Sequence, residues 1–104
     1  MKVVQRGIMK MVPGKMAEAM ELQEKHMAIV SRLGMPVTAM RMYHPFIGGE
    51  EYMHTLIFEV EWDSLAAMAA FFEKVMADPE MQALTPKWET VLASHQVEVL
   101  MLMP

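Results

Sequence analysis

The sequence of 104 residues contains no cysteine. This absence excludes disulfides, thiolate metal ligands and cysteine nucleophiles, and it fits a reducing cytoplasm. No segment approaches the roughly 20 apolar residues that cross a bilayer, so no membrane partner is expected. Arg6 and Lys10 stand where a signal peptide would need its apolar stretch, so we predict a cytoplasmic protein.

Runs of basic residues are also missing. The nine lysines and arginines are spread along a chain whose formal net charge is −4. Binding to nucleic acid depends on clustered positive charge, so no nucleic-acid partner is expected.

Apolar residues, in contrast, make up 54% of the chain, and fifteen residues are methionine. Soluble chains usually contain about 45–50% apolar residues, and the surplus needs either an exposed patch or a partner that covers it. A chain of this length predicts a single domain over residues 1–104. Methionine fills irregular cores and adaptable interfaces, and its sulfur also binds soft metals such as Cu(I).

Periodicity and turn residues predict the order strand, helix, strand, strand, helix, strand. The predicted strands are residues 3–12, 37–44, 52–61 and 95–103. The predicted helices are 15–33, one capped by Asp63 or Ser64, a short turn after Asp78-Pro79, and a short helix from Pro86 to Leu92. The breaks are Pro13-Gly14, Gly34 with Pro36 beyond it, and a loop from Pro45 to Glu51 that contains Gly48-Gly49.

With right-handed crossovers, this order predicts a ferredoxin-like βαββαβ domain of the α+β class. It has a four-stranded antiparallel sheet with helices on one face. If His44 pairs with Tyr52 in the hairpin, alternate residues separate onto two faces. The face toward the helices then carries Met40, Met42, His54, Leu56, Phe58 and Val60. The open face carries Val37, Ala39, Arg41, Tyr43, Thr55, Ile57, Glu59 and Glu61.

The open face mixes apolar and charged residues, which suits neither a solvent-facing surface nor an ordinary core. Coverage by the same face of a second copy accounts for both kinds of residue. The sequence therefore predicts a homodimer.

The layout, the strand-ending Pro13-Gly14-Lys15, the stretch FEVEWDSLAAMAAFF (58–72) and Asp78-Pro79 resemble the dimeric α+β barrel superfamily. Within it, the antibiotic-biosynthesis-monooxygenase-like and NIPSNAP-like families are nearest. The resemblance implies a barrel made from two sheets, with ligands bound between sheet and helices or inside the barrel. Haem-degrading members use an Asn, Trp and His set, and this chain contains no asparagine. NIPSNAP-like first strands tend to carry an arginine, and Gly7 falls near that place.

The charged candidates are Arg6, Lys10, Arg41, Glu59 and Glu61. Arg6 should meet Glu59, because the first and third strands are neighbours in this fold. We favour a structural ion-pair network, since buried charges are mostly paired for structural reasons. The alternative makes Arg6 or Arg41 the anchor of an anionic or carbonyl-bearing ligand, with Tyr43 as a hydrogen-bond donor.

His44 and His54 are expected near the hairpin end beside Met42, a set that suits copper. We favour ordinary packing, because no close ligand spacing such as H-x-x-x-H is present. His44, His54, Tyr43 or Glu59 could move a proton on a bound molecule. Trp88 is expected to be a packing anchor that could also cover a pocket.

His26 is expected to pack beside the apolar stripe of the first helix, and His95 receives no assignment. Because no catalytic spacing is present, the sequence names no catalytic residue and leaves open whether the protein is an enzyme.

The predicted function is small-molecule binding, with a cofactor-independent monooxygenase-like reaction on a small apolar or aromatic compound. A non-catalytic binding or assembly module is the alternative, and a Met/His copper protein ranks below both. No resident cofactor or metal is predicted.

Overall fold

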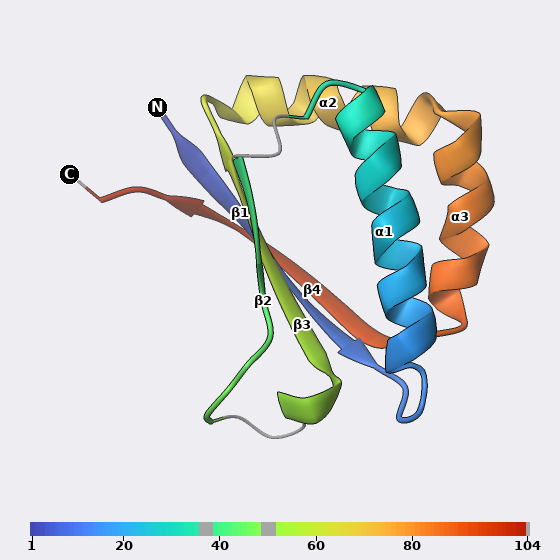
Figure 1. Cartoon of the computed structure of the whole chain (residues 1–104). Coiled ribbons are helices and arrows are strands. Elements are labelled where there is room, and N and C mark those ends of the chain that lie inside the picture. The colour runs from blue at the N-terminus through green and yellow to red at the C-terminus, as the bar shows by residue number, and fades with distance from the viewer. Residues whose placement is uncertain (36–38, 49–51, 104) are drawn as a thin grey trace.

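The computed structural model describes residues 1–35, 39–48 and 52–103. The elements are β1 (Val3–Met11), α1 (Met16–Arg32), β2 (Met40–Tyr43), the short 3-10 helix η2 (Tyr52–His54), β3 (Thr55–Trp62), α2 (Leu65–Ala77), α3 (Pro79–Glu89) and β4 (Leu92–Met101). The four strands form one antiparallel sheet in the order β2-β3-β1-β4 (Figure 1). The predicted ferredoxin-like α+β fold is confirmed. None of the helices in the described ranges is long and apolar enough to cross a membrane.

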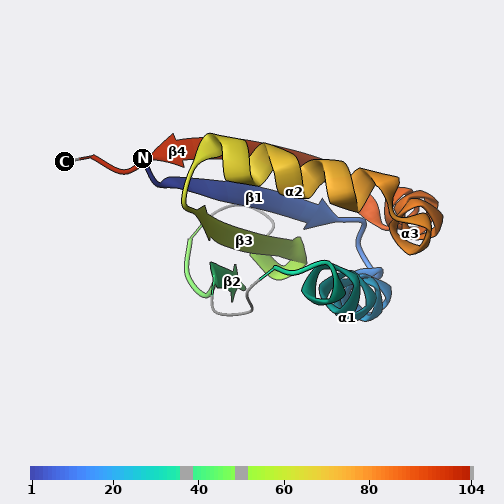
Figure 2. The same ribbon diagram turned by 90° about the horizontal axis from the view of Figure 1, so that it is seen from above.

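The helices pack against one face of this sheet. α1 and α3 lie side by side, and α2 runs across one end of the face, as the two views in Figures 1 and 2 show. The other face carries no helix among the described residues. Right-handed crossovers bring each helix back to the same side, as the element order predicts.

The helix ends form where local chemistry predicts. Gly34 adopts a positive φ of 108°, and the N–H groups of Gly34 and Met35 bond back to the carbonyls of Ser31 and Val30. This pair of bonds ends α1 in a Schellman motif, which favours glycine at that position. Ser64 caps α2, because its hydroxyl accepts a hydrogen bond from the N–H of Ala67 at 3.0 Å.

The prediction of two short helices after Asp78 is wrong, because Pro79–Glu89 forms one continuous helix. Asp78 caps it as expected, accepting from the N–H of Met81 at 3.1 Å. Pro86 lies inside this helix, where a proline removes only one backbone hydrogen bond. The preceding turn is held further by the Thr85 hydroxyl, which donates to the Met81 carbonyl at 3.1 Å.

The strand pairing corrects the assumed hairpin. Met40 pairs with Val60 and Tyr43 with Ile57, so the pairing of His44 with Tyr52 is wrong. The 3-10 helix η2 occupies Tyr52–His54, so β3 begins only at Thr55. The shift is an even number of residues, so the residues within β2 and β3 keep their predicted faces, whereas Ala39 and His54 lie outside the two strands and their predicted places are wrong. The expectations for residues 36–38 and 49–51 lie outside the described residues.

The last strand begins three residues earlier than predicted, because Leu92 already pairs with Met11 across a register shift. Strand β1 therefore has a neighbour on each side along its length. Its burial alternates strictly, with Val3, Gln5, Gly7, Met9 and Met11 buried against the helices. This alternation is the period-2 pattern of a strand whose two faces differ.

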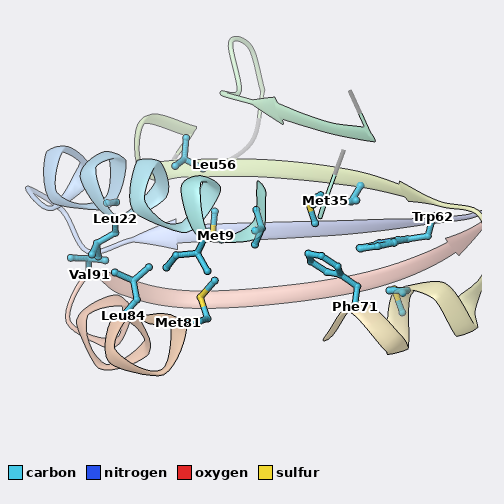
Figure 3. Close-up of a cluster of buried hydrophobic side chains, with 14 of the residues drawn as sticks. Met9, Leu22, Met35, Leu56, Trp62, Phe71, Met81, Leu84 and Val91 are labelled. Atoms are coloured by element: carbon cyan, nitrogen blue, oxygen red, sulfur yellow. The ribbon is translucent and has the colours of Figure 1, made fainter. Parts of the chain in front are cut away.

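The core fills the space between the sheet and the helices (Figure 3). At one end, the Trp62 ring packs against Phe71 with ring centroids 5.4 Å apart, and its Nε1 donates to Gln5 Oε1 at 3.1 Å. That hydrogen bond satisfies two buried polar groups at once. The buried apolar residues are Val3, Met9, Met11, Ala19, Leu22, Ile29, Val30, Met35, Leu56, Val60, Trp62, Met68, Phe71, Met81, Leu84 and Val91.

Helical spacing in the sequence predicts two apolar stripes, and the structure confirms them only in part. The first helix is predicted to bury Met16, Ala19, Met20, Gln23, Met27 and Val30, and the second Leu65, Met68, Ala69, Phe72, Val75 and Met76. In α1, Leu22 and Ile29 are buried, whereas Met20 is exposed. In α2, Met68 is buried as expected, but the buried aromatic residue is Phe71 and Phe72 is partly exposed. A helix that covers only one end of the sheet buries a narrow strip, so much of its apolar surface stays outside.

Candidate functional site

A cavity of about 620 Å³ lies between the covered face of the sheet and the helices. Both layers contribute to its wall, and most of the side chains are apolar. The lining residues are Met9, Gln23, His26, Met40, Phe58, Val75, Met76, Met81, Gln82, Thr85, Trp88, Glu89, Leu92 and His95. Known ligand pockets fall in the range of about 300–1,000 Å³, so the space suits a small organic molecule.

Aromatic rings form two parts of the wall. Phe58 projects from β3 across Gly7 of β1, and a Cβ at Gly7 would collide with the Phe58 ring. Glycine in the middle of β1 therefore makes room for this ring. On the helix side, Trp88 meets His26 edge to face, with ring centroids 6.5 Å apart. The cavity thus has an aromatic surface on the sheet and another on α3.

Two histidines line the same cavity from opposite layers. His26 comes from α1, and His95 comes from β4, where it pairs with Met9 of β1. The His95 ring lies 6.2 Å from the Phe58 ring, measured between centroids. Neither imidazole has a hydrogen-bond partner among the described residues. Their donor and acceptor groups are therefore available to a bound molecule.

Partial loss of solvent lowers the pKa of both histidines below the usual value, although His26 is only half-buried and His95 is exposed. For His26 the first cause is loss of solvent, and the second is repulsion by His95 when both are charged. For His95 the cause is the same loss of solvent. A histidine with a lowered pKa is neutral at neutral pH, and a neutral imidazole has one donor and one acceptor nitrogen.

Three other polar side chains of the lining donate hydrogen bonds to groups within the protein. Gln82 donates to the carbonyl of Met76 at 2.9 Å, and Gln23 donates to the sulfur of Met42 at 3.7 Å. The Thr85 hydroxyl donates to the Met81 carbonyl. The lining contains one carboxylate, Glu89, and no lysine or arginine among the described residues.

The charged candidates gather on the opposite, open face of the sheet. Arg6 lies in register with both Glu59 and Glu98, as the predicted neighbour relation requires, and its ion pair at 4.0 Å is with Glu98. Arg41 also lies in register with Glu59, and the Tyr43 hydroxyl donates to Glu59 at 3.2 Å. The Arg6 Nε is buried without a hydrogen-bond partner in the described part of the chain.

The remaining candidates divide between the cavity and the loops. Trp88 lines the cavity, in line with its predicted place over a pocket. His44 is exposed, with its Nδ1 3.1 Å from the Pro45 carbonyl oxygen, and His54 ends η2. Neither belongs to the lining. Across the described ranges, no three or more histidine, aspartate or glutamate side chains come together as a metal site requires. The Met42, His44 and His54 copper set stays a prediction.

Sequence analysis missed the two cavity histidines. A signal existed for His95, because the alternation along β4 places it on the same face as Val97 and Val99, which pair with Gly7 and Gln5. For His26 the sequence offered only its place beside the apolar stripe. The tertiary structure decides which strand this part of α1 crosses, and the sequence pattern does not indicate it.

Solved structures with this fold include NIPSNAP proteins and an antibiotic biosynthesis monooxygenase. No protein-family model and no curated protein matches the sequence. A NIPSNAP domain protein from Burkholderia xenovorans matches with a TM-score of 0.77 and 21% identity, covering 97% of this chain and 94% of that chain. An antibiotic biosynthesis monooxygenase matches with a TM-score of 0.70 and 14% identity, covering 98% of this chain and 99% of that one.

This chain has the NIPSNAP and antibiotic-biosynthesis-monooxygenase fold. SnoaB, a cofactor-independent oxygenase from Streptomyces nogalater, has it too, with a TM-score of 0.69, 10% identity and coverage of 99% of this chain and 94% of that chain. At these identities the likeness establishes the fold. The predicted resemblance is confirmed at that level.

Proposed function

We propose that this protein binds a small, mostly apolar organic molecule in the cavity between sheet and helices. The observation that carries the proposal is an apolar cavity of about 620 Å³ on which two unpartnered, neutral histidines converge. An apolar pocket with a few convergent polar groups is the usual form of a ligand site. The alternative of a non-catalytic assembly module needs no such cavity.

We further propose a cofactor-independent, monooxygenase-like reaction. The fold is shared with an oxygenase of that description, and neutral His26 or His95 can accept a proton from a weakly acidic group of the bound molecule. The electron pair left on the ligand would then attack molecular oxygen. One oxygen atom would stay on the ring carbon as a carbonyl, and the other would leave as water with the two hydrogens that the ligand loses, so the ligand itself supplies the electrons. A reducing cytoplasm remains the expected compartment, because the chain has no cysteine.

Naphthalene is a suitable probe for the binding proposal, since it is apolar and its fluorescence reports transfer out of water. We expect one bound molecule per chain. Thr85→Trp, which adds a large ring at an exposed part of the lining, should abolish binding. Thr90→Trp is the matched control, because Thr90 caps the same helix outside the lining. Equal binding by both variants would contradict the location, and no binding by the native chain would contradict the proposal.

The reaction is tested separately by measuring oxygen consumption with dihydroxynaphthalene. We expect consumption above the rate without protein, and its loss when His26 and His95 are both replaced by leucine. Binding without oxygen consumption would leave a ligand-binding protein and exclude this reaction for that class of compound.

We also propose that the open sheet face is covered by a second copy, which would close the two sheets into a barrel. Val4, Ile8 and Ile57 on this face are already half-buried, and charges of both signs alternate among them. In a twofold-symmetric dimer this face meets the same face of the second copy, so a positive charge on one chain can lie opposite a negative charge on the other. Ile8→Glu should convert a dimer into a monomer in sedimentation equilibrium, whereas Thr90→Glu should not. A native chain that is monomeric at micromolar concentration would exclude the dimer.

A further inference from the structure

We infer, on the basis of the proposed binding function, that the ligand is uncharged and that it carries a hydroxyl group bound between His26 and His95. The apolar part of the molecule would lie against Phe58 and Trp88. The inference starts from three facts about the cavity. Two imidazoles and the Glu89 carboxylate of the lining make no hydrogen bond among the described residues, aromatic surfaces lie beside the imidazoles, and the described lining holds no lysine or arginine.

The charge of the lining excludes an anchored anion. A carboxylate or phosphate inside an apolar cavity needs a paired positive charge, because an isolated buried ion is strongly disfavoured. The arginines of this sheet, Arg6 and Arg41, lie in register on the open face, away from the cavity. Glu89 would add repulsion, since it is the carboxylate of the lining.

The two imidazoles match a hydroxyl better than any group that only donates or only accepts. Each neutral ring has one N–H donor and one acceptor nitrogen, and the described residues satisfy neither. A hydroxyl donates one hydrogen bond and accepts another, so it can join one ring as donor and the other as acceptor. A ligand without such a group would cover the half-buried His26 and the exposed His95 without replacing their hydrogen bonds to water, which costs affinity.

Acid should weaken binding of this ligand. The titratable groups that face the site are His26 from α1, His95 from β4 and Glu89 from α3. The parts of β1, β2, β3 and α2 that line it contribute only Met9, Met40, Phe58, Val75 and Met76. A protonated imidazole no longer accepts a hydrogen bond, and two protonated rings repel each other. An anionic ligand would show the opposite trend, because it would bind together with a proton.

Three probes that share a ring system test the inference: 2-naphthol, 2-methoxynaphthalene and 2-naphthoate. At pH 7.5 we expect 2-naphthol to bind about fivefold to tenfold more tightly than 2-methoxynaphthalene, the value of about one hydrogen bond. We expect 2-naphthoate to bind at least about thirtyfold more weakly than 2-naphthol, because its charge stays unpaired. Affinity for 2-naphthol should fall as the pH is lowered into the range where the two histidines protonate, which lies below their usual value, with folding at each pH checked by circular dichroism.

Single variants His26→Leu and His95→Leu should each remove most of the preference for 2-naphthol over 2-methoxynaphthalene, because each removes one partner of the hydroxyl. His44→Leu is the control, because His44 is exposed outside the lining. If a leucine variant fails to fold, the corresponding phenylalanine variant, His26→Phe or His95→Phe, replaces it, because phenylalanine keeps a ring but has no donor or acceptor nitrogen, and the preference should fall there too.

The outcomes separate this inference from the binding proposal beneath it. If none of the probes binds, the proposed function fails. If 2-methoxynaphthalene binds as tightly as 2-naphthol and Thr85→Trp blocks both, the proposal of ligand binding in the cavity is supported and the hydroxyl inference is wrong. Tighter binding of 2-naphthoate, or of 2-naphthol as the pH falls, would overturn the charge assignment.

Discussion

The two faces of one sheet differ in how they treat polar groups. On the covered face, Gln5 is buried and bonded to Trp62, and His95 is neutral and faces a cavity. On the open face, Arg6 and Glu59 are half-buried, and Arg6 forms an ion pair with Glu98 at 4.0 Å. The two sets alternate along the same strands, so neighbours in sequence experience different surroundings. A residue type therefore has a different role according to the parity of its position.

This difference explains why the candidate site lies on the covered face, although most of the residues predicted from the sequence lie on the open face. Charged residues are easily recognised in a sequence, and most of the charged candidates lie on the open face. The cavity lies on the covered face, where an aromatic residue, a glycine and two histidines are placed to leave space rather than to fill it.

The largest effect should come from cutting side chains on adjacent positions of β3. Leu56→Ala removes a side chain that is 4% exposed and should lower the free energy of unfolding by about 2–5 kcal/mol. Ile57→Ala acts on the open face, where the side chain is half-buried, and should cost about half as much. Urea unfolding at low protein concentration measures both. Equal losses would contradict the difference between the faces.

The next effect concerns Gly7 and Phe58. Gly7→Ala should cost about 1–3 kcal/mol, because the added methyl group collides with the Phe58 ring. The double variant Gly7→Ala, Phe58→Leu should lose less than the sum of the single losses, since the shorter side chain relieves the collision. Additive losses in the same unfolding assay would show that the two side chains do not compete for space.

A smaller effect is expected from removing one hydrogen bond on each face. Trp62→Phe leaves the buried Gln5 oxygen without its donor and should cost about 1–3 kcal/mol. Tyr43→Phe removes the exposed bond to Glu59 and should cost less than about 0.5 kcal/mol. If the second loss matched the first, Glu59 and Tyr43 would have to be buried in solution, as in a dimer.

The smallest effect is the change with pH in the free energy of unfolding that His26 and His95 cause. The pKa of His26 and of His95 is lowered in the fold, so the unfolded chain binds protons first as the pH falls. Stability from these groups should therefore be complete above about pH 6.5 and should decline below it until the folded imidazoles also protonate. Replacing both histidines by leucine should flatten the unfolding midpoint between pH 7.5 and 5.5. An unchanged slope would mean that other groups cause it.

Much of the fold follows from local patterns. Pro13-Gly14, Gly34 and Ser64 mark turns and helix ends where the structure has them. The pairing of Arg6 with Glu59 in the sheet follows from the strand order. The errors occurred where a longer context decides. Pro86 did not end α3, and Phe71 rather than Phe72 faces the core, because helix packing selected between them.

The candidate site was predicted less well. Trp88, expected as a packing anchor that could also cover a pocket, lines the cavity, and the charged set lies on the open face, as expected, outside the lining. No spacing in the sequence connects His26 with His95, since one lies on a helix and the other on a strand near the end of the chain.

The sequence by itself determined the order of the elements, their caps and the set of side chains on each face, because these depend on neighbours a few residues apart. Only the tertiary structure decided that a cavity remains between the layers and that two imidazoles meet in it. The volume left over depends on how far α1 and α3 stand from the sheet, and side chains from distant parts of the chain set that distance together.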